Sequence, residues 1–90
     1  MRDAFRVGAV IAIPDELIGE SVIDEVFDDA TATRLARQHP LRSRCDRFVA
    51  RDPGDNLIVL LAGVYHYWDH ESGALIRLGT APTDFVLDAE

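Results

Sequence analysis

The chain has 90 residues, of which 48% are hydrophobic and 28% charged, and it carries a formal net charge of −7. This composition is typical of one folded domain and excludes a disordered chain, so we expect a single domain over residues 1–90. The negative charge argues against a general affinity for nucleic acid or anionic lipid, and the single cysteine, Cys45, excludes an internal disulfide and a zinc site with two thiolates.

The N-terminal third predicts a strand followed by a helix. Residues 5–13 (FRVGAVIAI) are mostly apolar and rich in β-branched side chains, which is typical of a buried strand. Over residues 15–30 apolar side chains recur at helical spacing, whereas Glu20, Asp24 and Asp28 fall on the opposite half of the helical wheel. We therefore predict an amphipathic helix over 15–30 with an acidic outer face.

A second, short helical segment is predicted over residues 31–38, ended by His39 and Pro40. From Asp46 onward the apolar side chains recur with a period of two, and Phe48 and Ala50 are predicted to face the core. Residues 52–56 (DPGDN) have the composition of a hairpin turn.

Residues 57–68 (LIVLLAGVYHYW) predict a central strand that bends near Ala62 and Gly63, with a buried helix as the competing interpretation. After a turn over 69–73, residues 74–79 predict another strand and residues 83–87 a short edge strand. The predicted fold is α+β: an antiparallel sheet of three to five strands, in the order β-α-β-β-β, with one helical layer packed on one face.

Six of the nine arginines lie within residues 34–51, and the chain has no lysine. Eight carboxylates precede this segment and seven follow it, so the chain is acidic, then basic, then acidic. One interpretation is a site for a phosphate ligand or RNA, because guanidinium groups bind phosphate oxygens in a bidentate manner; its residues would be Arg42, Arg44, Arg47 and Arg51. The competing interpretation is that the arginines neutralise the acidic helix or lie on a solvated surface.

The densest group of potential metal ligands is His66, Asp69 and His70. On a strand the two histidines would lie about 13 Å apart, at about 3.3 Å per residue, which is too far for one metal ion. We therefore assign no metal ligands, no catalytic residues and no cofactor. No GxSxG, Walker, GxGxxG or HExxH motif occurs, which favours a protein that is not an enzyme; a small metal-dependent enzyme is retained as a third hypothesis.

Tyr65 and Tyr67 are predicted to project to one side of the central strand. One helical layer covers only one sheet face in so small a domain, so these rings would either form a binding surface or be buried in the monomer.

Our first hypothesis is a small acidic protein–protein interaction module in the cytoplasm, acting as an inhibitor or regulatory protein. It would bind a protein partner, or form a homodimer, through Glu20, Asp24, Asp28, Tyr65 and Tyr67. No run of apolar residues approaches the roughly 20 needed to span a membrane, and neither a membrane nor nucleic acid is an expected partner.

Overall fold

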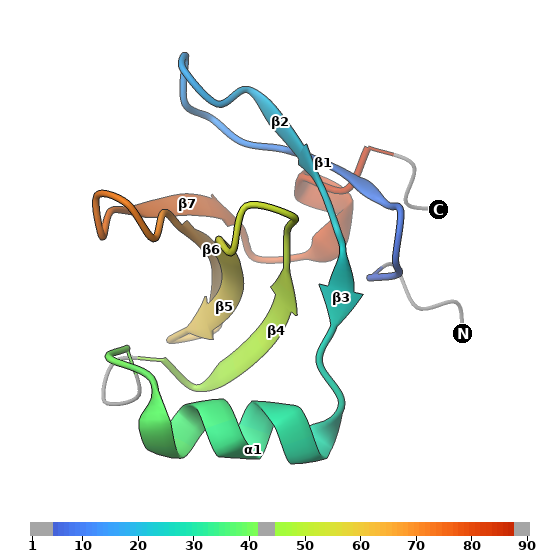
Figure 1. The fold of residues 1–90 in the computed structure, drawn as a ribbon. Coiled ribbons are helices and arrows are strands. Elements are labelled where there is room, and N and C mark those ends of the chain that lie inside the picture. Colours follow the sequence, from blue (N-terminus) through green and yellow to red (C-terminus); the bar gives the residue numbers. More distant parts are fainter. Residues whose placement is uncertain (1–4, 42–44, 88–90) are drawn as a thin grey trace.

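The main sheet has five antiparallel strands in the order β3-β4-β5-β6-β7, and a two-stranded sheet, β1-β2, packs beside it (Figure 1). This computed structural model describes residues 5–41 and 45–87. It confirms the predicted α+β class with an antiparallel sheet and one helix. The elements in chain order are β1 (Val10–Ala12), β2 (Glu20–Val22), β3 (Glu25–Val26), α1 (Asp29–Gln38), β4 (Arg47–Arg51), β5 (Leu57–Leu61), β6 (Val64–Trp68), β7 (Leu75–Gly79) and the 3-10 turn η1 (Pro82–Asp84).

The predicted acidic helix over 15–30 is wrong. Residues 14–19 form a turn, and the chain then enters β2 and β3 before α1 begins at Asp29. The β-branched residues of this stretch suit a strand, and Ile23 donates its backbone N–H to the Ala9 carbonyl at 2.9 Å. Asp28 caps α1, since its Oδ1 accepts the Thr31 N–H at 2.8 Å. The second predicted helical segment is confirmed, and it ends at His39 as expected.

Residues 57–68 form two strands instead of one bent strand, and the competing interpretation of a buried helix is wrong. The chain reverses completely at Ala62 and Gly63, whose φ angles are 51° and 78°. Two successive positive φ angles are what a two-residue type I′ hairpin turn requires. As a result β5 and β6 pair in register from Leu61 opposite Val64 to Leu57 opposite Trp68.

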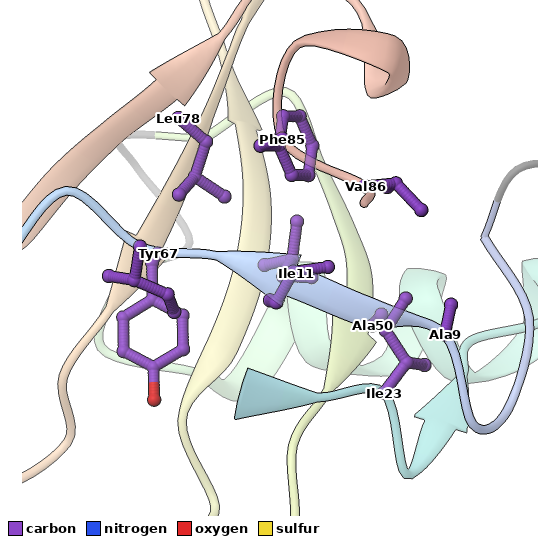
Figure 2. Packing of buried hydrophobic residues seen from close by; sticks show 10 residues of the cluster. Ala9, Ile11, Ile23, Ala50, Tyr67, Leu78, Phe85 and Val86 are labelled. Carbon is purple, nitrogen blue, oxygen red and sulfur yellow. The ribbon is translucent and has the colours of Figure 1, made fainter. Parts of the chain in front are cut away.

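Two groups of buried side chains cover the two faces of the main sheet. One group joins the sheet to the β1-β2 hairpin and to residues 85–87, which we call the C-terminal segment. Figure 2 shows Ile11, Tyr67, Leu78 and Phe85 within this group. The other group joins the sheet to α1. Phe48 and Ala50 are fully buried, as predicted, but they belong to different groups because β4 has an irregularity between them.

The C-terminal segment packs against β1. After η1, Val86 forms a β-bridge with Ile11, so the edge strand predicted over 83–87 is reduced to a short contact. Backbone bonds run from Ala12 N–H to the Phe85 carbonyl at 2.8 Å and from Leu87 N–H to the Val10 carbonyl at 2.9 Å. β1 therefore lies between β2 and the C-terminal segment, and the resulting layer sits at the end of the molecule opposite α1 (Figure 1).

Candidate functional site

A buried carboxylate ties the β1-β2 hairpin to the main sheet. Asp52 follows β4 and is only 5% exposed. Its Oδ1 accepts the backbone N–H groups of Gly54 and Asn56 at 3.0 and 2.9 Å. Its Oδ2 accepts the hydroxyls of Ser21 and Tyr67 at 2.8 and 2.5 Å and the Asn56 side-chain amide at 3.2 Å. Both oxygens are thus fully used in joining β2, β6 and the 52–56 turn.

The protonation states of this network follow from its contacts. Burial alone would raise the pKa of Asp52, but the hydrogen bonds from Tyr67, Ser21 and Asn56 outweigh it and hold the pKa below its usual value. Burial, followed by the hydrogen bond to the charged Asp52 and that charge itself, raises the pKa of Tyr67. The network is therefore an ionised carboxylate held by neutral donors. With its oxygens occupied, Asp52 is suited to positioning the hairpin and not to accepting a proton from a substrate.

The outer side of the hairpin carries a row of exposed aliphatic side chains. Val10 and Val22 pair across β1 and β2, and each is 36% exposed. Leu87, which is 56% exposed, bonds to Val10 through the backbone on the other side of β1. Directly opposite residues in antiparallel strands project to the same side, and their neighbours Ile11 and Val86 project inward. The row therefore spans three adjacent chain segments.

A groove of about 470 Å³ lies between this row and the turn after β4. It is lined by Val10, Glu20, Ser21, Val22, Asp52, Pro53 and Gly54. A second groove, of about 420 Å³, also reaches Gly54 and is lined by Leu17, Ile18, Gly54, Asn56, Tyr67, Asp69, His70 and Glu71. The described residues that line the two grooves include four acidic ones, Glu20, Asp52, Asp69 and Glu71, and no arginine.

The structure does not place the three predicted acidic residues on one helix face. Glu20 lies on β2 and lines the first groove. Asp24 lies between β2 and β3, where its Oδ2 is 3.0 Å from Nη2 of Arg51, and Asp28 is the N-cap of α1. Of the three, Glu20 alone lines a groove at the hairpin.

The two predicted tyrosines pack against other parts of the domain. Tyr67 is 2% exposed, and its hydroxyl is part of the Asp52 network. Tyr65 is half-buried, and its ring packs at centroid distances of 5.2 and 5.6 Å from Phe5 and Phe85. The sheet face for which an open binding surface was one of the two alternatives is therefore covered by the hairpin, Phe5 and the segment around Phe85. The alternative that both faces are buried in the monomer describes Tyr67 correctly.

The two arginines of β4 form ion pairs with carboxylates. Arg47 lies 2.8 Å from Asp29 at the start of α1. Arg51 lies between Asp24 at 3.0 Å and both Glu25 and Asp55 at 3.4 Å. Burial lowers the pKa of Arg51, but these three carboxylates reverse the effect and raise it overall. Arg42 and Arg44, the other residues of the predicted phosphate site, lie outside the described residues.

The histidines of the third hypothesis belong to different elements. His66 lies on β6 and its Nδ1 is 3.0 Å from the Val64 carbonyl. His70 lies in the turn before β7, where its Nδ1 is 2.7 Å from Oδ1 of Asn56. Asp69 accepts hydrogen bonds from within the same turn. Within residues 5–41 and 45–87, no group of three histidine, cysteine or acidic side chains is arranged to hold a metal ion.

Sequence reasoning missed the hairpin face, which we define as Val10, Val22, Leu87, Glu20 and Pro53. Residues 10–12 (VIA) are all apolar, so the sequence does not show which of them face outward. The helix predicted over 15–30 also removed the partner strand from consideration. None of the helices in the described part of the chain has the length and apolar character to cross a membrane.

Comparisons with protein-family models, curated proteins and solved structures find no match to this chain.

Proposed function

We propose that this domain acts by binding another protein through the hairpin face. The observation that carries the proposal is the row formed by Val10, Val22 and Leu87, three exposed aliphatic side chains from three adjacent segments. Contiguous apolar side chains surrounded by polar groups are typical of protein-binding surfaces. The groove beside the row, with Pro53 on its far wall, gives a partner side chain a place to enter.

The charge around the hairpin face defines the chemistry of the partner. Glu20 is an exposed carboxylate at the edge of the row, and the whole chain carries a net charge of −7. Arg51, the arginine nearest in sequence to the turn at Pro53, is already paired with three carboxylates. A complementary surface would have an apolar centre and a basic rim, because matched potentials steer association and exclude other partners.

Narrower forms of the proposal concern role and location. Regulation or inhibition of the partner is the role that binding without catalysis would serve, and we retain the cytoplasm as the proposed location because of the single cysteine. The arginine pairs of β4 favour this proposal over phosphate binding, since Arg47 and Arg51 would have to leave carboxylates to bind a phosphate.

Site-specific photo-crosslinking in lysate of the native host tests the proposal. A photoreactive residue at position 22 should form a discrete adduct with a basic protein, whereas the same residue at Ala36, an exposed position on α1, should not. With the purified partner, Val22→Asp should weaken binding at least tenfold, Ala36→Asp should leave it unchanged, and added salt should weaken the wild-type complex.

Two results would overturn this assignment. Equal labelling from positions 22 and 36, or an unchanged Kd for Val22→Asp, would remove the hairpin face as the binding surface. Sedimentation equilibrium of the purified protein tests for self-association. If the protein is a dimer and Val22→Asp dissociates it, the hairpin face binds a second copy of this chain in place of a basic partner. Circular dichroism of each variant checks that the fold is intact.

A further inference from the structure

Leu17, at the tip of the β1-β2 hairpin, is 97% exposed. Its neighbour Ile18 is half-buried and packs against the core group that contains Ile11. The hairpin tip extends away from the rest of the molecule (Figure 1). Leu17 is thus the most exposed of the large hydrophobic side chains in the described residues.

The turn that carries Leu17 is fixed by hydrogen bonds. Oδ1 of Asp15 accepts the backbone N–H groups of Leu17 and Ile18 at 2.9 and 3.3 Å. The Asp15 carbonyl accepts the Gly19 N–H at 2.8 Å, and Ile13 donates to the Gly19 carbonyl at 2.9 Å. Gly19 has a φ of 70°, which its missing Cβ permits at little cost. Leu17 is therefore presented by an ordered turn, so that little backbone entropy is lost when it binds.

The base of the hairpin is held on both sides. Ser21 of β2 bonds to Asp52, and β1 bonds to Phe85 and Leu87 of the C-terminal segment. The hairpin is thus bonded to the rest of the domain through both of its strands. This arrangement favours a rigid projection that docks as a unit.

Charge at the tip limits the surface that could receive Leu17. Glu16 is exposed beside it, and the groove that Leu17 lines also contains Asp69 and Glu71. Carboxylates on both sides of an apolar tip oppose insertion into an anionic lipid surface. They suit a pocket whose floor is apolar and whose rim carries lysine or arginine.

We propose that Leu17 is an anchor residue that enters an apolar, basic-rimmed pocket on the protein partner, with Glu16 meeting the rim. This inference rests on the proposed function, since it names the part of the interface that enters the partner. It requires that the partner contact the tip as well as the hairpin face. Because the Leu17 side chain is 97% exposed, we expect that replacing it leaves the fold unchanged.

The test compares variants against the partner captured from position 22, then purified. Leu17→Ser should keep the wild-type Tm and weaken binding about 10- to 100-fold, the amount expected when one buried leucine is lost. Glu16→Arg should also weaken binding, and the loss of affinity should be larger at low salt than at high salt. Thr33→Ser, on an exposed position of α1, is the matched control and should bind as the wild type.

The outcomes separate this inference from the proposed function. If Leu17→Ser binds within twofold of wild type while Val22→Asp does not bind, the anchor is refuted and the hairpin face stands. If neither variant changes the Kd, or position 22 captures no partner, both fail. Wild-type protein that co-sediments with phosphatidylserine vesicles, and loses this binding in Leu17→Ser, would replace the protein pocket by a membrane surface.

Discussion

The Tyr67 hydroxyl on β6 donates to Oδ2 of Asp52 at 2.5 Å; Asp52 directly follows β4, and β5 lies between β4 and β6 in the sheet. The same oxygen accepts the Ser21 hydroxyl from β2. One carboxylate oxygen thus joins the centre of the main sheet to the hairpin. Stability of the hairpin and stability of the sheet are coupled at this atom.

Tyr67→Phe should destabilise the domain by about 1.5–3 kcal/mol, because a hydrogen bond to a buried charged group is lost. The midpoint of urea unfolding, followed by circular dichroism, measures the change, and the slope m should stay constant. Tyr65→Phe is the matched control: its hydroxyl forms no hydrogen bond that the structure records among the described residues, so its effect should be close to zero. Equal losses for the two variants would contradict the role given to the Tyr67 hydroxyl.

Acid should weaken the fold through Asp52. Its pKa in the folded protein is lower than the usual 3.8, so the folded state binds fewer protons than the unfolded state. The stabilisation is complete above the unfolded pKa and is lost as the pH falls through the folded pKa. Urea midpoints measured between pH 5 and pH 2 should fall more steeply for wild type than for Asp52→Asn. Asp28, whose pKa is also lowered, contributes equally to both proteins; parallel curves would count against this prediction.

His39 predicts a second pH dependence, nearer neutrality. Burial lowers the pKa of His39 below 6.5, its Nδ1 accepts the Leu41 N–H at 3.1 Å, and its ring packs edge-on against Phe48 and Trp68. The stabilisation is complete above the unfolded pKa and is lost as the pH falls from there through the folded value. NMR titration of the imidazole should give a midpoint below 6.5, and His39→Gln should remove this part of the pH dependence. A midpoint at or above 6.5 would refute the prediction.

Ala62→Asn should stabilise the β5-β6 hairpin by about 0.5–1 kcal/mol. Ala62 has a φ of 51°, where an alanine is strained and asparagine is tolerated. Gly63→Ala should destabilise the hairpin by about 1 kcal/mol or more, because an alanine is strained at its φ of 78°. An added Cβ would meet no other atom within 4 Å, so this backbone strain is the whole expected effect. Thermal unfolding of both variants checks the pair, and a lower Tm for Ala62→Asn would show that the turn geometry differs.

Local signals predicted the C-terminal half of the fold well. The composition of residues 52–56 indicated a turn, and the period of two placed Phe48 and Ala50 inside. At Ala62 and Gly63 the sequence predicts a bend instead of a reversal, because alanine is not a usual residue for a positive φ and the flanking residues form one continuous apolar run.

The sequence predicts the N-terminal half wrongly because its decisive contacts are distant in sequence. Ile18, Val22, Ile23 and Phe27 fit a helical stripe, yet Ile23 and Phe27 are buried while Val22 lies outside. The partner strand of β2 and the Asp52 carboxylate that accepts the Ser21 hydroxyl are both tertiary contacts. The local pattern of apolar residues carries no information on these tertiary contacts, and strand pairing overrides the helical pattern. The exposed row of Val10, Val22 and Leu87 became visible only once these segments were assembled.

The bridge between Ile11 and Val86 has a consequence for how the protein is made. Because β1 needs residues 85–87 to complete its layer, this layer cannot form until that segment has been synthesised. Pairing over such a span is slow, and the apolar residues of β1 stay uncovered meanwhile. Nascent chains halted before Phe85 would therefore be targets for chaperones and proteases, because the layer that contains β1 cannot close in them.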